Sequence, residues 1–286
     1  MQLRGHSSFS LKDILGLLDL CREASNRILA CYSDEANKGR LNDKADRTPL
    51  TEADLASHEI LGSGLRDLRP ALPLLSEECS EEEIAGRRQW SSFWMVDPLD
   101  GTREFLDRTG EFTINIALIE SQRPSLGLVY EPMSQTANLG IVGEGAWTLR
   151  RESGAWQARA VRTRKLPADT MVILASRRHR NTRLEDCLRF LESTHALSRK
   201  DSGSALKFCD LAAGRGDCYP RFSPCSEWDV AAGDALLTAA GGAIWGLDGQ
   251  PLRYNARDTL LSPHFVAVGD PDVALWNDLL GCMGAA

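Results

Sequence analysis

The sequence predicts an α/β fold in which two subdomains share one cleft. Residues 71–142 are rich in short apolar segments that end at Pro or Gly turns, a pattern typical of strands. From about residue 170 the pattern changes to strands that alternate with helices. Because no flexible linker separates the two patterns, we expect a single unit, 1–286, made of subdomains 1–165 and 166–286.

Two helices are predicted before the first strand. Apolar residues recur at helical spacing over 11–32. Residues 33–49 are charged and show no periodicity, so we expect a mobile loop or a loose hairpin there. The second helix covers 51–68, and Thr51 and Asp54 at its start have the spacing of a capping box.

The remaining elements follow from alternation and from turn residues. In the first half we expect strands at 71–76, 93–96, 112–120, 126–130 and 137–142. In the second half we expect strands at 171–175 and 218–222, and helices at 184–191, 204–213, 230–240 and 271–280. Gly241 and Gly242 end the third of these helices.

The composition excludes several classes of function. The chain of 286 residues is 43% hydrophobic and carries a net charge of −7, so it has no general basic field for a nucleic-acid polymer. Its eight cysteines form no C-x-x-C pair, which disfavours zinc and redox motifs. Residues 1–10 are polar, and no apolar stretch approaches the ~18 residues of a membrane span. We expect a cytoplasmic protein, with peripheral association at the inner membrane and the oligomeric state left open.

The most informative segment is Asp97-Pro98-Leu99-Asp100-Gly101-Thr102, directly after an apolar strand. We expect Pro98 to stop the strand. Two carboxylates three residues apart gather negative charge that is costly unless a cation is bound. If Gly101 and Thr102 open the next helix, their backbone N–H groups point at an anion. A cation beside an anion indicates metal-assisted phosphate chemistry.

Each acidic residue near this segment also has a purely structural interpretation. Asp54 could complete the capping box, Asp100 could cap the helix after it, and Asp229 could be the N-cap of the helix at 230–240. Glu77 could lie in a solvated turn. Taken together, however, Glu77, Asp97 and Asp229 follow strands or precede helices, and in α/β sheets such points converge on one crevice. Carboxylates and a carbonyl at that crevice suit two or more Mg²⁺ ions.

Other mechanisms have little support in the sequence. It contains neither a G-x-S-x-G elbow nor a G-x-x-x-x-G-K-S/T phosphate loop, and its five histidines are dispersed. Lys207 and Arg221 are candidates for binding a substrate phosphate because both lie beside segments that we expect to face the cleft. Solvated surface positions are the alternative for both residues.

The motifs resemble the lithium-sensitive phosphatase superfamily that includes inositol monophosphatase. The resemblance covers about residues 15–268 and rests on Thr51–Asp54, Leu75–Glu78, Asp97–Phe105, Trp228–Gly233 and Ala240–Gly242. Further stretches resemble its 3′(2′),5′-bisphosphate nucleotidase (CysQ-type) branch: 101–105, 110–119, 206–209 and 219–222. The branch often has Lys at the position of Arg103 and Ser at the position of Ala205.

The resemblance implies a layered α-β-α-β-α sandwich and a role for each site residue. Two or three Mg²⁺ ions are implied: one held by Glu77, Asp97 and the Leu99 carbonyl, and another held by Asp97, Asp100 and Asp229. Thr102, paired with Asp54, would orient and deprotonate the attacking water, with Glu77 on the same side. Substrate contacts are implied for Gly101, Thr102, Asp229, Ser204, Lys207 and Arg221.

The implied substrate is a small phosphate ester, adenosine 3′,5′-bisphosphate, which loses its 3′-phosphate to give AMP. The same metal chemistry on an inositol phosphate or on fructose 1,6-bisphosphate is the nearest alternative. A catalytically inactive phosphoester sensor is the non-enzymatic alternative. Phosphate release from a panel of esters would separate these hypotheses.

Overall fold

The computed structural model describes residues 9–33, 42–43, 49–177 and 181–284. Its helices are α1 (Leu11–Ser33), α2 (Glu52–Leu68), α3 (Thr102–Leu106), α4 (Thr182–Glu192), α5 (Leu206–Ala212), α6 (Trp228–Ala240) and α7 (Leu275–Gly284). A small antiparallel pair, β1 (Asn42–Asp43) and β2 (Pro49–Leu50), lies between α1 and α2. None of the described helices is long and apolar enough to cross a membrane.

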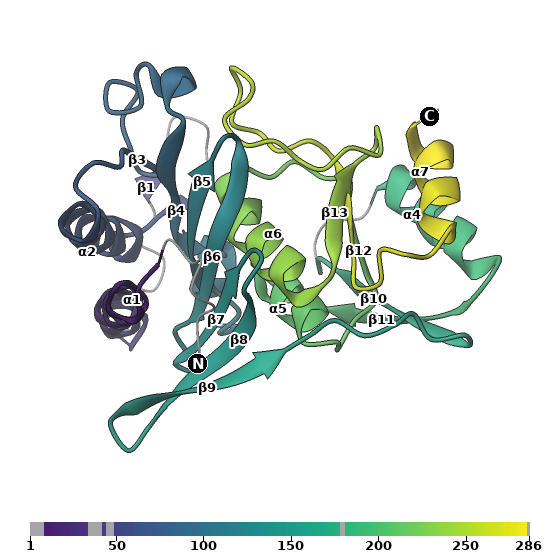
Figure 1. The fold of residues 1–286 in the computed structure, drawn as a ribbon, viewed down its shortest axis with the longest axis horizontal. Coiled ribbons are helices and arrows are strands. Elements are labelled where there is room, and N and C mark those ends of the chain that lie inside the picture. The colour runs from purple at the N-terminus through teal and green to yellow at the C-terminus, as the bar shows by residue number, and fades with distance from the viewer. Residues whose placement is uncertain (1–8, 34–41, 44–48, 178–180, 285–286) are drawn as a thin grey trace.

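The remaining strands form two sheets, which Figure 1 shows side by side. The seven-stranded sheet has its strands in sequence order: β3 (Leu74–Ser76), β4 (Ser92–Asp100), β5 (Thr113–Glu120), β6 (Arg123–Glu131), β7 (Thr136–Ile141), β8 (Gly145–Glu152) and β9 (Ala155–Val161). Only the β3–β4 pair of this sheet is parallel. The five-stranded sheet has the order β11 (Ala196–Asp201), β10 (Thr170–Ala175), β12 (Cys218–Arg221), β14 (Phe265–Val268) and β13 (Ala243–Gly246).

Strand alternation distributes the apolar side chains over three cores. In β4, Trp94 and Val96 pack in the core with α1 and α2, whereas Phe93 and Met95 point to the opposite face of the sheet. That second core contains α5 and α6, which lie between the sheets. A third core joins the outer face of the five-stranded sheet to α4 and α7. The layers are therefore helix, sheet, helix, sheet, helix, and the predicted α-β-α-β-α sandwich is confirmed.

Close packing of α6 on the seven-stranded sheet places the start of that helix at the site. A Cβ at Gly127 of β6 would lie 2.1 Å from the Ala232 carbonyl oxygen, so only glycine allows this approach. The residues of α6 that face the sheets are Ala, Leu and Val and are almost fully buried. The helix is consequently held on both sides, and so is Asp229 in its first turn.

Several predicted boundaries need correction. Strand β4 runs through Pro98 to Asp100, because the ladder to β5 is broken by an irregularity between Asp97 and Asp100 and no backbone donor is needed at the proline. The last helix, α7, begins at Leu275 rather than at residue 271. Strands β8, β9, β11, β13 and β14 were not predicted. The expected loop at 33–49 lies largely outside the described residues; within it, Asn42–Asp43 pairs antiparallel with Pro49–Leu50.

Candidate active site

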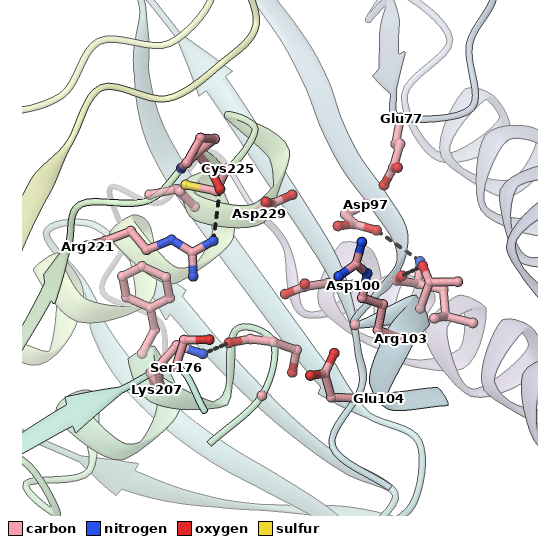
Figure 2. A pocket seen from close by; sticks show the side chains of 18 of the residues that line it. Glu77, Asp97, Asp100, Arg103, Glu104, Ser176, Lys207, Arg221, Cys225 and Asp229 are labelled. Carbon is pink, nitrogen blue, oxygen red and sulfur yellow. Dashed lines mark hydrogen bonds between the residues drawn. The ribbon is translucent and has the colours of Figure 1, made fainter. Parts of the chain in front are cut away.

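A cavity of about 400 Å³ opens between the two sheets (Figure 2). One side is built by the residues after β3, the end of β4 and the start of α3, and the other by α5, β12 and α6. Ten of the eleven predicted site residues line it: Glu77, Asp97, Leu99, Asp100, Gly101, Thr102, Ser204, Lys207, Arg221 and Asp229. The eleventh, Asp54, is buried behind Thr102.

The end of β4 is shaped by its irregular ladder. Asp97 is only 2% exposed, and its Oδ1 accepts a hydrogen bond of 3.0 Å from the Leu99 backbone N–H. The Ser57 hydroxyl on α2 donates to the Pro98 carbonyl over 2.8 Å. These two bonds fix the turn, so that Leu99 contributes its backbone to the cavity while its side chain is buried in the core with α1 and α2.

Asp54 combines a structural and a site contact. The Asp54 carboxylate accepts hydrogen bonds from the Thr51 backbone N–H (2.8 Å) and from the Thr51 hydroxyl, which completes the predicted capping box of α2. Its other oxygen lies 3.3 Å from the Thr102 hydroxyl, which is also 3.3 Å from the Leu99 carbonyl oxygen. The Thr102 hydroxyl is therefore within reach of a buried carboxylate at the edge of the cavity.

Gly101 provides the turn between β4 and α3. Its φ of 91° is in the left-handed region, and a Cβ there would lie 3.0 Å from the Glu111 carbonyl oxygen. The chain can then reverse at once, and Thr102 becomes the first residue of α3. The expectation that this pair opens a helix is confirmed, although α3 has only five residues.

Asp229 lies in the first turn of α6 but is not its N-cap. The N-cap is Glu227, because the helix begins at Trp228. The Asp229 Oδ2 instead accepts a hydrogen bond of 3.0 Å from the Ser226 backbone N–H. The structural alternative for Asp229, an N-cap position, is therefore excluded, and its side chain faces the cavity.

The acidic side chains raise one another's pKa. Burial raises the pKa of Asp229 to about 8, and the charges of Asp100 and Glu77 add to the effect. Burial raises the pKa of Asp100 to about 6, although Lys207 and a 3.1 Å hydrogen bond from Asn115 oppose the change. Burial, Glu77, Asp100 and Asp229 together raise the pKa of Asp97 well above its ordinary value. A cation at this position would relieve the repulsion.

The donor set fits a hard divalent cation. Carboxylates and a carbonyl line the cavity, and these oxygens are the ligands that Mg²⁺ prefers. Within the described part of the chain, no three His, Cys, Asp or Glu side chains are close enough together to form a ready-made metal site. The carboxylates thus line one cavity, but their side chains are not close enough together to coordinate one ion as they stand.

The opposite wall carries Lys207 and Arg221. Lys207 is 3% exposed, and its Nζ donates to the carbonyl oxygens of Ser202 (3.0 Å) and Ser204 (2.6 Å). Burial lowers the pKa of Lys207 to about 8, which the Asp100 charge partly offsets. Arg221 donates to the main-chain oxygens of Ser223 (3.3 Å) and Pro224 (3.0 Å). Figure 2 shows the guanidinium of Arg221 extending toward Asp229 and Asp100.

Ser204 lies on the turn that Lys207 holds. Its φ of 39° is unusual for a residue with a side chain, and its buried Oγ has no hydrogen-bond partner among the described residues. The Glu111 carboxylate fixes the same turn by accepting from the Gly203 N–H over 2.8 Å. The Ser204 hydroxyl is thus available to a molecule in the cavity.

Some lining residues had no predicted role. They are Arg103, Glu104, Ser176, Gly203, Phe208, Tyr219, Pro224, Cys225 and Val230. Ser176 directly follows β10, so the strand-end argument that identified Asp97 could have found it. Arg103 and Glu104 directly follow the central motif. Burial raises the pKa of the Cys225 thiol to about 12, so it stays protonated at neutral pH.

The fold and the cavity define a phosphatase-like α/β protein, and the sequence assigns its family. The profile of the inositol monophosphatase family matches residues 13–270, and the chain belongs to this family. It is 40% identical over 246 residues to the 3′(2′),5′-bisphosphate nucleotidase CysQ of Escherichia coli (strain K12), which covers 86% of this chain and 95% of that protein. The family is typically metal-dependent.

Solved structures of other proteins have the same fold. The crystal structure of CysQ from Bacteroides thetaiotaomicron has a TM-score of 0.79 and 33% identity, covering 93% of this chain and all of that one (100%). An inositol monophosphatase from Thermotoga maritima has a TM-score of 0.72 at 19% identity and covers 96% of this chain and 98% of its own. This second similarity shows the fold alone.

Proposed function

We propose that this chain hydrolyses the 3′-phosphate of adenosine 3′,5′-bisphosphate to give AMP and phosphate. The observation that carries the proposal is a single cavity in which four carboxylates, with Asp97 buried among them, face Lys207 and Arg221. Its membership of a phosphatase family and its 40% identity to a 3′(2′),5′-bisphosphate nucleotidase support the same reaction. We further propose that 1–165 and 166–286 act as subdomains of one catalytic unit in the cytoplasm.

The acidic wall of the cavity, which carries Glu77, Asp97, Asp100 and Asp229, is proposed to bind two or three Mg²⁺ ions. Glu77, Asp97 and the Leu99 carbonyl would hold one ion, and Asp97, Asp100 and Asp229 a second. When bound, such ions neutralise phosphate charge and lower the pKa of the attacking water. The raised pKa values of Asp97 and Asp229 support this assignment, because a bound cation would offset the repulsion among these carboxylates.

The chain's own residues then position the reactants. The Thr102 hydroxyl, 3.3 Å from Asp54, would hold the attacking water and pass its proton toward that carboxylate. The water oxygen forms the new bond to phosphorus, the bond from phosphorus to the 3′ oxygen breaks, and the 3′ oxygen is protonated from solvent. The backbone N–H groups of Gly101 and Thr102 would receive phosphate oxygens. Ser204, Lys207, Arg221 and Asp229 would contact the rest of the substrate.

A comparison of substrates tests the proposal. Phosphate release is measured from adenosine 3′,5′-bisphosphate, inositol 1-phosphate and fructose 1,6-bisphosphate, each with Mg²⁺ and with a chelator. We expect kcat/KM to be highest for the nucleotide by at least ~10-fold, and to vanish with the chelator. Preference for the inositol or sugar phosphate would overturn the nucleotide assignment. Binding without turnover of any ester would instead indicate a sensor.

A further inference from the structure

A second cavity, of about 610 Å³, lies away from the carboxylates, and the two cavities share no described lining residue. It forms where the segment after β13 meets the β5–β6 turn. The Tyr254 backbone N–H donates to the Gln122 carbonyl over 3.0 Å, and Arg123 donates to the Leu252 carbonyl over 2.9 Å. Figure 1 shows this yellow-green segment reaching across to the ends of β5 and β6.

Three arginines line this cavity from separate positions: Arg123 at the start of β6, and Arg253 and Arg257 after β13. Asp248 is the only acidic residue in its described lining, and its Oδ1 already accepts a hydrogen bond of 2.9 Å from the Gln250 N–H. In a chain with a net charge of −7, this concentration of positive charge is local to the cavity.

The arginine side chains keep most of their hydrogen-bond donors available. Each guanidinium has five N–H donors. Within the described residues Arg123 bonds only to the Leu252 carbonyl, and Arg253 only to the Gln122 side chain, at 3.5 Å. Arg257 donates to the Leu261 carbonyl and lies 3.6 Å from a Glu227 carboxylate oxygen. The donors that remain match the oxygens of a tetrahedral anion.

The rest of the lining suits an organic group attached to that anion. Leu252, Pro251 and Pro263 supply apolar surface. His264 accepts a hydrogen bond of 3.2 Å at Nδ1 from Arg183, so its Nε2 carries the proton and is a neutral donor. Burial and the Arg183 charge lower the pKa of His264, which keeps the ring neutral.

We propose that this cavity is a second ligand site, which binds a small organic phosphate or sulfate through Arg123, Arg253 and Arg257. The inference does not depend on the reaction in the carboxylate cavity. Non-hydrolysable probes are therefore appropriate: phenylphosphonate for the phosphate group and benzenesulfonate for the sulfate group.

Calorimetric titration of the full chain with Mg²⁺ tests the site, using Arg253→Ala and Arg253→Glu. Arg253 is exposed, so neither change should alter the melting temperature. We expect two binding components for at least one probe. Arg253→Ala should weaken one of them by about 10-fold and Arg253→Glu should abolish it, because charge-assisted hydrogen bonds are lost. The probe with the larger effect identifies the anion.

Two further variants locate the binding. Arg159→Ala removes an equally exposed arginine from β9 and should leave both components unchanged. Arg221→Ala should weaken only the component that Arg253→Ala leaves intact. The proposal is wrong if the Arg253 variants titrate like the unaltered chain, if Arg221→Ala removes all binding, or if neither probe binds at millimolar concentration.

Discussion

The two walls of the carboxylate cavity carry charges of opposite sign and stabilise them in different ways. On the acidic wall, burial raises the pKa of Asp97, Asp100 and Asp229, and the charge of Glu77 raises each of them further, so burial and repulsion act in the same direction. On the basic wall, Lys207 and Arg221 donate to main-chain carbonyls, which replace part of the lost hydration. A bound cation or a bound proton would therefore relieve the repulsion on the acidic wall, whereas the basic wall is already held by hydrogen bonds.

Breaking the acidic wall should have the largest effect on activity. Asp100→Asn keeps an oxygen that can accept the Asn115 hydrogen bond but removes one negative charge. We expect kcat to fall by at least ~100-fold at saturating substrate, because a proposed metal ligand is lost. Phosphate release across a Mg²⁺ titration measures the effect.

The matched control for this variant is Asp258→Asn. Asp258 is fully exposed and pairs with Arg88 at 2.8 Å, so the same chemical change should leave kcat unaltered. If Asp100→Asn turns over at the unaltered rate with Mg²⁺, the metal assignment on this wall is wrong.

The two walls also differ in how well the sequence predicted their residues. Asp97, Asp100 and Thr102 lie within six consecutive residues after an apolar strand, so local pattern alone located them. Asp54 was predicted as a capping residue and as a site residue, and the structure places it in both contacts. For Asp229 the N-cap position was only the structural alternative to a site role, and it is excluded because α6 begins at Trp228, two residues before the expected start, a shift that helix propensity does not resolve.

The basic wall and the second sheet were harder to predict. Ser176 and Cys225 reach the same cavity because β10 and β12, the strands that precede them, are parallel neighbours in the five-stranded sheet. Strand β11, with the sequence Ala-Leu-Ser-Arg-Lys-Asp, is mostly exposed and carries little apolar signal. Edge strands of this kind are specified by pairing with their neighbour, which a local pattern does not contain.

Altering the basic wall should have a smaller effect, mainly on substrate binding. Arg221→Lys keeps the positive charge but loses the planar fork that binds two oxygens at once. We expect KM for adenosine 3′,5′-bisphosphate to rise about 10-fold while kcat stays within about threefold. Arg215→Lys is the control, since Arg215 is exposed and pairs with Asp210 at 2.7 Å away from the cavity. A loss confined to kcat would show that Arg221 acts on the chemical step instead.

The smallest expected effect is on stability. Its dependence on pH and Mg²⁺ should differ between the clustered carboxylates of the acidic wall and the isolated carboxylate of Asp234. The pKa of Asp229 is raised to about 8 and that of Asp100 to about 6, from an ordinary value of 3.8. Without metal, the folded state therefore holds more protons than the unfolded state between pH of about 4 and 8. Its free energy of unfolding should fall as the pH rises through this range. Mg²⁺ binds the deprotonated carboxylates and should oppose the fall.

Melting temperatures measured from pH of about 5 to 8, with Mg²⁺ and with a chelator, should therefore diverge as the pH rises. Asp234 supplies the reference: burial raises its pKa to about 6, and the Tyr254 hydroxyl donates to it over 2.9 Å, outside the cavity. Asp234→Asn should remove only the Asp234 share of the fall, which lies below pH of about 6, equally in both conditions, and should leave the difference between the conditions unchanged. If the difference in melting temperature between Mg²⁺ and chelator does not change with pH, the carboxylates of the acidic wall do not form a cation-binding cluster.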